Sequence, residues 1–170
     1  MFLVKSTEKV PCPCCGEKLN VIGSRRRNYR ERSGEKKVLV IRRLRCTDCQ
    51  KIHHELPDFL VPYKRYQADC LEKALSEPET CDIAADNAMI YRWEKWFCAL
   101  ADYWINCLHA IHLCFQLEKD PVNPMPTGSL TVLEQLGQIV STGSGWLSRM
   151  TRPIANVNLW VQTRPTFLSE

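Results

Sequence analysis

Hydrophobic residues in the N-terminal part of the chain form two short, β-prone runs separated by an arginine-rich stretch. The runs span residues 18–22 and 38–44, and the stretch between them contains a turn-like Ser-Gly-Glu segment at Gly34. A hairpin that returns the chain from residue 16 to residue 45 accounts for this pattern. We therefore predict a small β unit over residues 1–55.

Farther along the chain, the pattern changes to that of amphipathic helices. Pro57 and Pro62 restrict the residues before them to extended conformations, which predicts a linker over residues 56–65. A first helix is expected from about residue 66, and Pro78 ends it. Its apolar face consists of Cys70, Leu71, Ala74 and Leu75.

The next segment has the pattern of a helix-turn-helix. A short helix at residues 82–85 would precede a polar turn, and Asp86 or Asn87 would cap a second helix that continues to about Glu118. The residues of this second helix expected to face a DNA groove are Asn87, Ala88, Tyr91, Arg92 and Lys95. An ordinary helical hairpin has the same spacing, and this alternative stays open.

An apolar stripe follows the expected long helix. Its members are Trp93, Trp96, Phe97, Leu100, Trp104, Cys107, Leu108, Ile111, Cys114 and Phe115. Such a stripe is typical of a core or of an interface completed by a second copy, so a homodimer through this helix is one expectation. Residues 120–128 read as a connector, and Thr131 and Glu134 form a capping box for a helix that ends near Val140. Residues 141–145 read as a turn, and no structure is assigned to 146–170.

Four of the ten cysteines form two Cys-x-x-Cys pairs, and this spacing lets both sulfurs of a pair reach one metal ion. Gly16 follows the first pair and can take the positive φ that a tight metal-binding turn needs. The sequence predicts one structural Zn²⁺ per chain. Its ligands are Cys12, Cys15, Cys46 and Cys49.

Other ligands compete with this set. Cys14 has poorer chelating spacings, and either His53 or His54 would give a site of three thiolates and one imidazole. Disulfides are disfavoured because paired Cys-x-x-Cys motifs in a reducing compartment are typical of metal sites. We favour four cysteine ligands and leave replacement by His53 or His54 open.

The predicted fold class is therefore α+β, in which a small N-terminal zinc ribbon precedes a mainly helical domain. The expected organisation is a zinc ribbon over residues 1–55, a linker over 56–65, a helix-turn-helix with its long helix over 66–119, and a connector, short helix and C-terminal tail over 120–170.

Charge is distributed unevenly along the chain. Residues 1–66 contain 16 Lys and Arg against 7 Asp and Glu, whereas residues 67–170 contain 7 against 12. Such a basic module is typical of proteins that bind a polyanion. The arginines expected to contact phosphates and base edges lie near the hairpin tip and on the returning strand. They are Arg25, Arg26, Arg27, Arg30, Arg42 and Arg43, with Tyr29 among them as a stacking candidate. A solvated hairpin is the alternative.

Several function classes are not expected. No charged segment precedes an apolar run, so we expect no secretory signal and a cytoplasmic, nucleoid-associated protein. Residues 96–115 are long enough to span a bilayer, but Asp102, Asn106 and His109 share one stripe, which favours a helix outside the membrane. No catalytic triad, phosphate loop or open metal site is recognised, so neither catalysis nor a small-molecule substrate is expected.

These motifs together resemble a known arrangement. Cys-Pro-x-Cys-Gly at Cys12, Arg-Arg-Leu-Arg-Cys-x-x-Cys at Arg42, Glu-Leu-Pro-x-Phe at Glu55 and Tyr-Lys-Arg-Tyr at Tyr63 are similar to the zinc ribbon and helix-turn-helix of insertion-sequence transposases. They also resemble an uncharacterised bacterial family that has these parts without the nuclease. The resemblance covers residues 10–97, and the chain has no room for the nuclease domain with its three acidic residues.

The resemblance implies DNA binding without strand cleavage. It carries over to the four cysteines and to Arg42, Arg43 and Arg92. The leading hypothesis is a protein that binds double-stranded DNA through the ribbon and the helix-turn-helix, as a transposase-like protein or a transcriptional regulator. The alternative is an interaction module that binds RNA or a protein of the transcription machinery.

Overall fold

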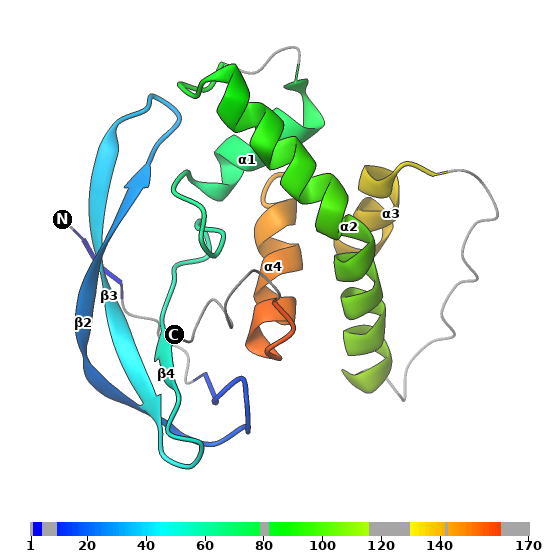
Figure 1. The fold of residues 1–170 in the computed structure, drawn as a ribbon. Coiled ribbons are helices and arrows are strands. Elements are labelled where there is room, and N and C mark those ends of the chain that lie inside the picture. Colours follow the sequence, from blue (N-terminus) through cyan, green and yellow to red (C-terminus); the bar gives the residue numbers. More distant parts are fainter. Residues whose placement is uncertain (1, 5–9, 79–81, 116–129, 142, 161–170) are drawn as a thin grey trace.

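The computed structural model describes residues 2–4, 10–78, 82–115, 130–141 and 143–160. Its elements in chain order are β1 (Phe2–Leu3), β2 (Leu19–Arg30), β3 (Lys36–Cys46), β4 (Ile52–His54), α1 (Ala68–Ser76), α2 (Asn87–Phe115), α3 (Val132–Val140) and α4 (Trp146–Asn156). A hairpin followed by helices, one of them long, confirms the predicted α+β fold class. Figure 1 shows the sheet on one side, the helices on the other, and residues 55–67 running between them.

The hairpin of β2 and β3 is longer than the sequence predicted. Its antiparallel register runs from the pair Leu19 and Cys46 to the pair Arg30 and Lys36, with one bulge next to Gly23. The arginine-rich stretch expected at the tip is therefore part of β2. Because side chains alternate along a strand, these arginines point to two different faces of the sheet.

β3 is the central strand. It pairs with β2 along one edge, and with β1 (parallel) and β4 (antiparallel) along the other. A small core of Tyr29, Leu39, Ile41 and Leu60 lies beneath the sheet. Tyr29 is only 5% exposed, and its ring packs 5.5 Å from that of Phe59. Tyr29 is therefore a core residue and cannot serve as the expected stacking residue.

Residues 56–65, expected as an extended linker, pack against both halves of the protein. Leu60 and Val61 are buried, the first in the ribbon core and the second in the helical core. Main-chain hydrogen bonds join this segment, called the connector from here on, to the end of β2: Arg30 N–H donates to the Arg65 carbonyl, and Gln67 N–H donates to the Arg30 carbonyl. The connector therefore holds the ribbon against the helices.

The short helix expected at residues 82–85 is absent, and this part of the prediction is wrong. α1 ends at Ser76 and α2 begins at Asn87, so the connection is longer than the turn of about three to four residues in a helix-turn-helix. Packing explains the difference, because Ile83 is buried in the helical core and the Ala84 N–H donates to the Arg32 carbonyl.

The loop at residues 82–85 fastens the hairpin tip to the helices. Asp82 forms ion pairs with Arg32 of the tip and Lys73 of α1, and these cations lower its pKa to about 2. Gly34 has a φ of 82°, and a Cβ at this position would lie 2.9 Å from the Cβ of Ala84. Glycine is thus needed at the tip both for the turn and for the close contact.

The helical core forms mainly around α2. Its buried side chains are Trp93, Phe97, Ala101, Trp104, Ile105, Cys107 and Leu108. They pack against α1, α3 and α4, so most of the predicted apolar stripe is covered within one chain. Leu113 and Phe115, at the end of α2, are exposed. No helix among the described residues is long and apolar enough to cross a membrane.

Two helix N-termini are capped in different ways. The capping box predicted at Thr131 is confirmed, because its hydroxyl accepts from the Glu134 N–H and Glu134 accepts from the Thr131 N–H. α4, which the sequence left unassigned, is capped from outside. The buried carboxylate of Glu72 in α1 accepts hydrogen bonds from Gly145 N–H (2.8 Å) and Leu147 N–H (3.0 Å).

Candidate metal centre and basic surface

The two Cys-x-x-Cys turns have nearly the same backbone structure. Cys12 N–H donates to the Glu17 carbonyl, and Cys46 N–H donates to the Lys51 carbonyl, so each turn is closed across six residues. The residue after the second cysteine has positive φ in both turns, 80° at Gly16 and 60° at Gln50. The role predicted for Gly16 is confirmed, whereas Gln50 takes the same conformation without the freedom of glycine.

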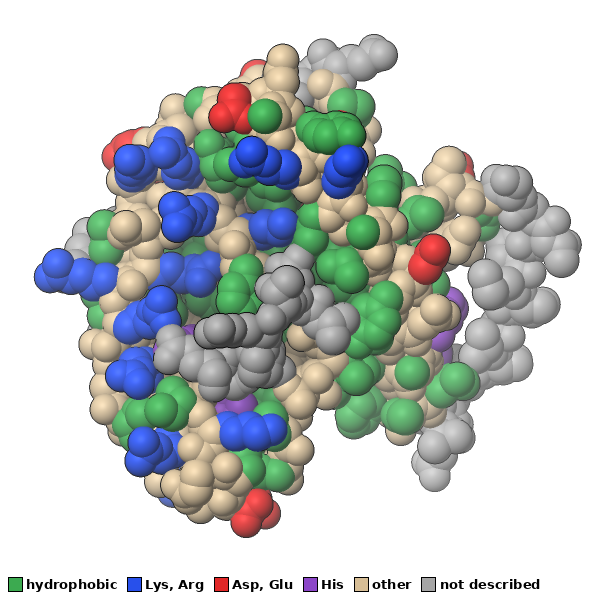
Figure 2. All heavy atoms as spheres, viewed as in Figure 1, with side chains coloured by type: hydrophobic (Ala, Val, Ile, Leu, Met, Phe, Trp, Pro, Cys, Tyr) green, Lys and Arg blue, Asp and Glu red, His purple; other side chains and the backbone are tan. Residues whose placement is uncertain are grey.

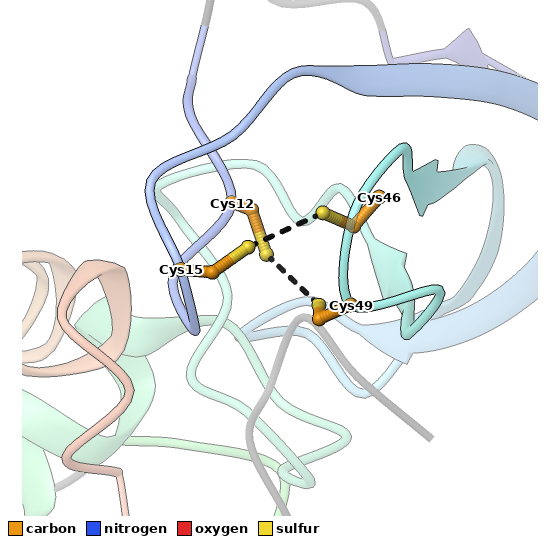
Figure 3. Close-up of side chains that lie close together, drawn as sticks. All are labelled: Cys12, Cys15, Cys46 and Cys49. Carbon is orange, nitrogen blue, oxygen red and sulfur yellow. Dashed lines mark hydrogen bonds between the residues drawn. The ribbon is translucent and has the colours of Figure 1, made fainter.

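The four predicted cysteines converge on one point (Figure 3). All four Sγ atoms lie within 4.8 Å of one another. The Cys12 and Cys49 sulfurs are 3.7 Å apart, and the Cys15 and Cys46 sulfurs are 3.4 Å apart. Sulfurs bound at about 2.3 Å around a tetrahedral zinc ion lie about 3.8 Å apart. The cysteines are therefore positioned to bind a metal ion.

Main-chain N–H groups surround the sulfurs in the same way in both turns. The first sulfur of each pair accepts from the residues two and three positions later, and the second from the residue two positions later. Burial raises the pKa of the Cys12 thiol. Burial also favours the neutral Cys46 thiol, but N–H groups of Asp48 and Cys49 and the Cys15 thiol outweigh it and lower the pKa of Cys46 to about 7. Such donors stabilise the thiolates that a metal requires.

The competing ligands lie beside this centre. His53 is fully buried, and its Nε2 is 3.3 Å from the Cys12 sulfur. Cys12, Cys14 and His53 form a second group with metal-binding distances, whereas His54 belongs to neither group. Four converging sulfurs form the more complete set. His53 then hydrogen bonds to a ligand sulfur, as residues around bound metals commonly do.

This arrangement predicts a specific role for His53. His53→Ala should weaken metal binding about tenfold, because Cys12 loses a hydrogen-bond partner. His53→Gln, which keeps an N–H donor, should lose less of its metal affinity. Competition with a chromogenic chelator measures both affinities. Unchanged affinity in His53→Ala would contradict this role, and complete loss of metal would instead make His53 a ligand.

The predicted basic residues of the sheet differ in their surroundings. Arg26 is exposed, and Arg43 is partly exposed. Arg42 forms a bidentate ion pair with Glu55, with Nη2 2.7 Å from Oε1, and this pairing raises the pKa of Arg42. Arg30 donates to the Gly34 carbonyl and lies over the Tyr66 ring. These two arginines therefore also hold the fold.

Arg27 is the most enclosed of the set. Its Nη2 donates to the Lys64 carbonyl at 2.9 Å, and burial lowers the pKa of Arg27, assisted by the charge of Arg25. Arg25 is itself exposed. Figure 2 shows Lys and Arg side chains following the sheet and connector along one face, whereas hydrophobic and uncharged side chains dominate over the helices.

The predicted residues of the long helix share one exposed face. Asn87, Ala88, Tyr91, Arg92 and Lys95 are all exposed and follow one another at helical spacing. The Lys95 ammonium lies over the Tyr91 ring, 4.8 Å from its centroid. The start of α2 therefore presents a polar, partly basic face to solvent.

Sequence reasoning missed one feature of the basic surface, the turn at residues 61–64. Tyr63 is half exposed, and the Lys64 ammonium lies 3.8 Å from the centroid of the Trp96 ring. Burial lowers the pKa of Lys64 to about 8. The signal that could have found the turn is Pro62, which favours the second position of a β-turn.

Comparison with known protein families matches residues 12–93 to a domain of unknown function (DUF6431). The matched stretch begins at the first metal-binding cysteine and ends at Trp93, so it includes both metal-binding turns, β2 to β4, the connector, α1 and the start of α2. No curated protein and no solved structure matches the chain. The match names no transposase, so the transposase resemblance stays a prediction.

Proposed function

We propose that the protein is a non-catalytic, zinc-containing protein that binds double-stranded DNA. The observation that carries the proposal is the position of the four-cysteine centre, at one end of a hairpin whose exposed surface is rich in arginine. A metal there would fix the end of a basic ribbon, and the ribbon would contact the phosphate backbone.

The donor set supports a structural zinc ion. Four thiolates satisfy the tetrahedral preference of zinc and leave no open position for a substrate or an activated water. The centre is formed by Cys12, Cys15, Cys46 and Cys49, and its role is to hold the two turns together. We therefore propose neither catalysis nor a small-molecule substrate.

The exposed face of α2 supports base readout as a second element of binding. An α-helix fits the major groove, and Arg92 is one turn and a half from the start of α2, where a guanidinium can pair with guanine. The connection between α1 and α2 is longer than that of a tight helix-turn-helix. The feature that the protein shares with that motif is therefore the exposed start of its second helix. A regulator or a transposase-like protein would use the same surface. The homodimer predicted through the long helix, α2, stays a prediction.

One observation favours the alternative, an interaction module that binds RNA or a protein of the transcription machinery. Val21 and Ile22, next to the bulge of β2, are 54% and 42% exposed. Exposed apolar side chains near a metal centre are suited to a protein contact. Competition between duplex DNA and RNA for one labelled probe separates the two candidates.

Two arginine substitutions test the proposal. Selection from a random duplex pool supplies a preferred site. Arg92→Ala should weaken binding to that site by about 1–3 kcal/mol and change binding to random duplexes far less. Arg26→Ala should weaken binding to the preferred site and to random duplexes alike. The slope of the logarithm of its binding constant against the logarithm of the salt concentration should become shallower by roughly one unit. Fluorescence anisotropy at several salt concentrations measures these effects.

Arg92→Lys is the matched control, because lysine keeps the charge and loses the bidentate fork. It should behave like Arg92→Ala on the preferred site and like the unmodified protein on random duplexes. If Arg92→Ala weakens all duplexes equally, α2 does not read bases. If no duplex binds the zinc-loaded protein, the proposed function is wrong.

A further inference from the structure

The connector contains a β-turn with an unusual residue at its third position. Lys64 N–H donates to the Val61 carbonyl at 3.1 Å, and Pro62 occupies the second position. Tyr63, at the third position, has a φ of 62°. Pro62 at the second position and positive φ at the third identify a type II turn, in which glycine or asparagine is the favoured third residue.

The turn is fixed on both sides, so the tyrosine is held in this conformation. Val61 and Pro62 are buried beneath it. On the other side, the Lys64 carbonyl accepts from Arg27, and the Lys64 ammonium lies over Trp96. Tyr63 is nevertheless 48% exposed. A bulky aromatic side chain in a strained conformation at a protein surface is a feature that clusters at ligand-binding sites.

The surroundings of Tyr63 are strongly basic. Arg25, Arg27 and Arg65 lie close enough that the charges of Arg25 and Arg65 contribute to the lowered pKa of Arg27, after the larger effect of burial, while Tyr63 acts in the opposite direction. Lys64 follows Tyr63 in the chain, but its ammonium lies over the Trp96 ring. Of these cations, Arg25 and Arg65 are exposed, and exposed arginines near an exposed ring suit a ligand that combines negative charge with a flat aromatic group.

We propose that Tyr63 stacks on an unpaired nucleotide base, while the exposed arginines nearby, Arg25 and Arg65, hold the adjacent phosphates. The inference deepens the proposed function and rests on it, because it names the nucleic-acid structure that the basic surface favours. Every base has an aromatic face, so such stacking is tolerant of sequence. The surface would therefore bind a duplex next to a bulge, a nick or a single-stranded end more tightly than an uninterrupted duplex.

The strain at Tyr63 separates this role from a structural one. Glycine would adopt a φ of 62° without steric cost, and asparagine would adopt it more readily than tyrosine. A residue kept only for the turn would therefore be replaced by glycine or asparagine with no loss. Replacing Tyr63 with glycine or asparagine should therefore weaken nucleic-acid binding without lowering the stability of the protein.

The experiment uses the full zinc-loaded chain and two fluorescein-labelled DNA probes, a 24-base-pair duplex and the same duplex with one unpaired nucleotide at its centre. The unmodified protein should bind the bulged probe more tightly. Tyr63→Gly and Tyr63→Asn should weaken binding to the bulged probe about fivefold or more and change the perfect duplex little. Tyr63→Phe, which keeps the ring, should bind both probes like the unmodified protein. The unfolding midpoints of the Gly and Asn variants should equal or exceed that of the unmodified protein.

Two results would overturn the inference: equal binding of the bulged probe by Tyr63→Gly and the unmodified protein, or a lower unfolding midpoint in both the Gly and Asn variants. Binding of neither probe by the unmodified protein would instead refute the proposed function. The two failures are therefore distinguishable.

Discussion

The Cys46→Ser protein is expected to be isolated without bound metal and with an unfolded ribbon. Cys46 is buried at the point where its turn meets β3, and its sulfur lies 3.4 Å from that of Cys15. A serine hydroxyl is a poor replacement for a thiolate ligand. The apparent binding free energy of a structural zinc ion is about 10–16 kcal/mol in small zinc-binding peptides, and it is largely folding free energy. The ribbon core contains few residues, so it cannot compensate for this loss.

Elemental analysis and thermal unfolding measure the effect. The unmodified protein should contain about one zinc ion per chain, and Cys46→Ser should contain almost none. Cys14→Ser is the matched control, because Cys14 lies in the other metal-binding turn, between Cys12 and Cys15, but outside the four-sulfur group. It should keep its metal and its unfolding midpoint. Full metal occupancy in Cys46→Ser, or metal loss in Cys14→Ser, would contradict the four-cysteine assignment.

A second large effect is expected at Glu72. Glu72→Ala should reduce the free energy of unfolding by about 3 kcal/mol, because the substitution leaves two main-chain donors of α4 without their carboxylate partner. Glu72 is only 7% exposed, and the Leu147 N–H is buried, so water cannot easily replace the carboxylate. The charge also complements the positive end of the α4 dipole. Urea denaturation followed by far-ultraviolet circular dichroism measures the change.

Two variants control for the simple loss of a glutamate. Glu72→Gln keeps one acceptor oxygen, so its free energy of unfolding should lie between those of the unmodified protein and Glu72→Ala. Glu134→Ala removes the exposed capping carboxylate of α3 and should have a much smaller effect, because water can reach the freed groups. If Glu72→Ala and Glu134→Ala destabilise the protein equally, the buried cap does not have the role described above.

Features encoded by neighbouring residues could be predicted from the sequence. The metal-binding turns depend on two-residue gaps and on Gly16, and the start of α3 depends on Thr131 and Glu134. Both are interactions within a few residues, so spacing alone was enough. The long helix was also predictable, because its apolar stripe is regular over many turns.

Features that depend on distant contacts could not be predicted. α4 begins at Trp146; its N-cap residue, Gly145, has no side chain to cap the helix, and the cap comes from Glu72. The loop at residue 83 has helical composition, but burial of Ile83 and the hydrogen bond from Ala84 to the hairpin hold it outside a helix. The same limit applies to the arginines of β2. Which of them face solvent depends on the register with β3 and on the connector that covers one face.

The attachment of the hairpin at both ends has a thermodynamic consequence. The metal centre fixes one end, and at the other end Gly34 packs against Ala84 while Arg32 pairs with Asp82. Any fluctuation that frees the tip must also release the loop at residues 82–85, which precedes α2, and loss of a bound metal would remove the anchor at the opposite end of the hairpin. A bound metal ion would therefore stabilise the folded helices as well as the folded ribbon. We therefore expect the two halves of the protein to unfold as a single cooperative unit, although the buried residues that the structure describes form two separate clusters.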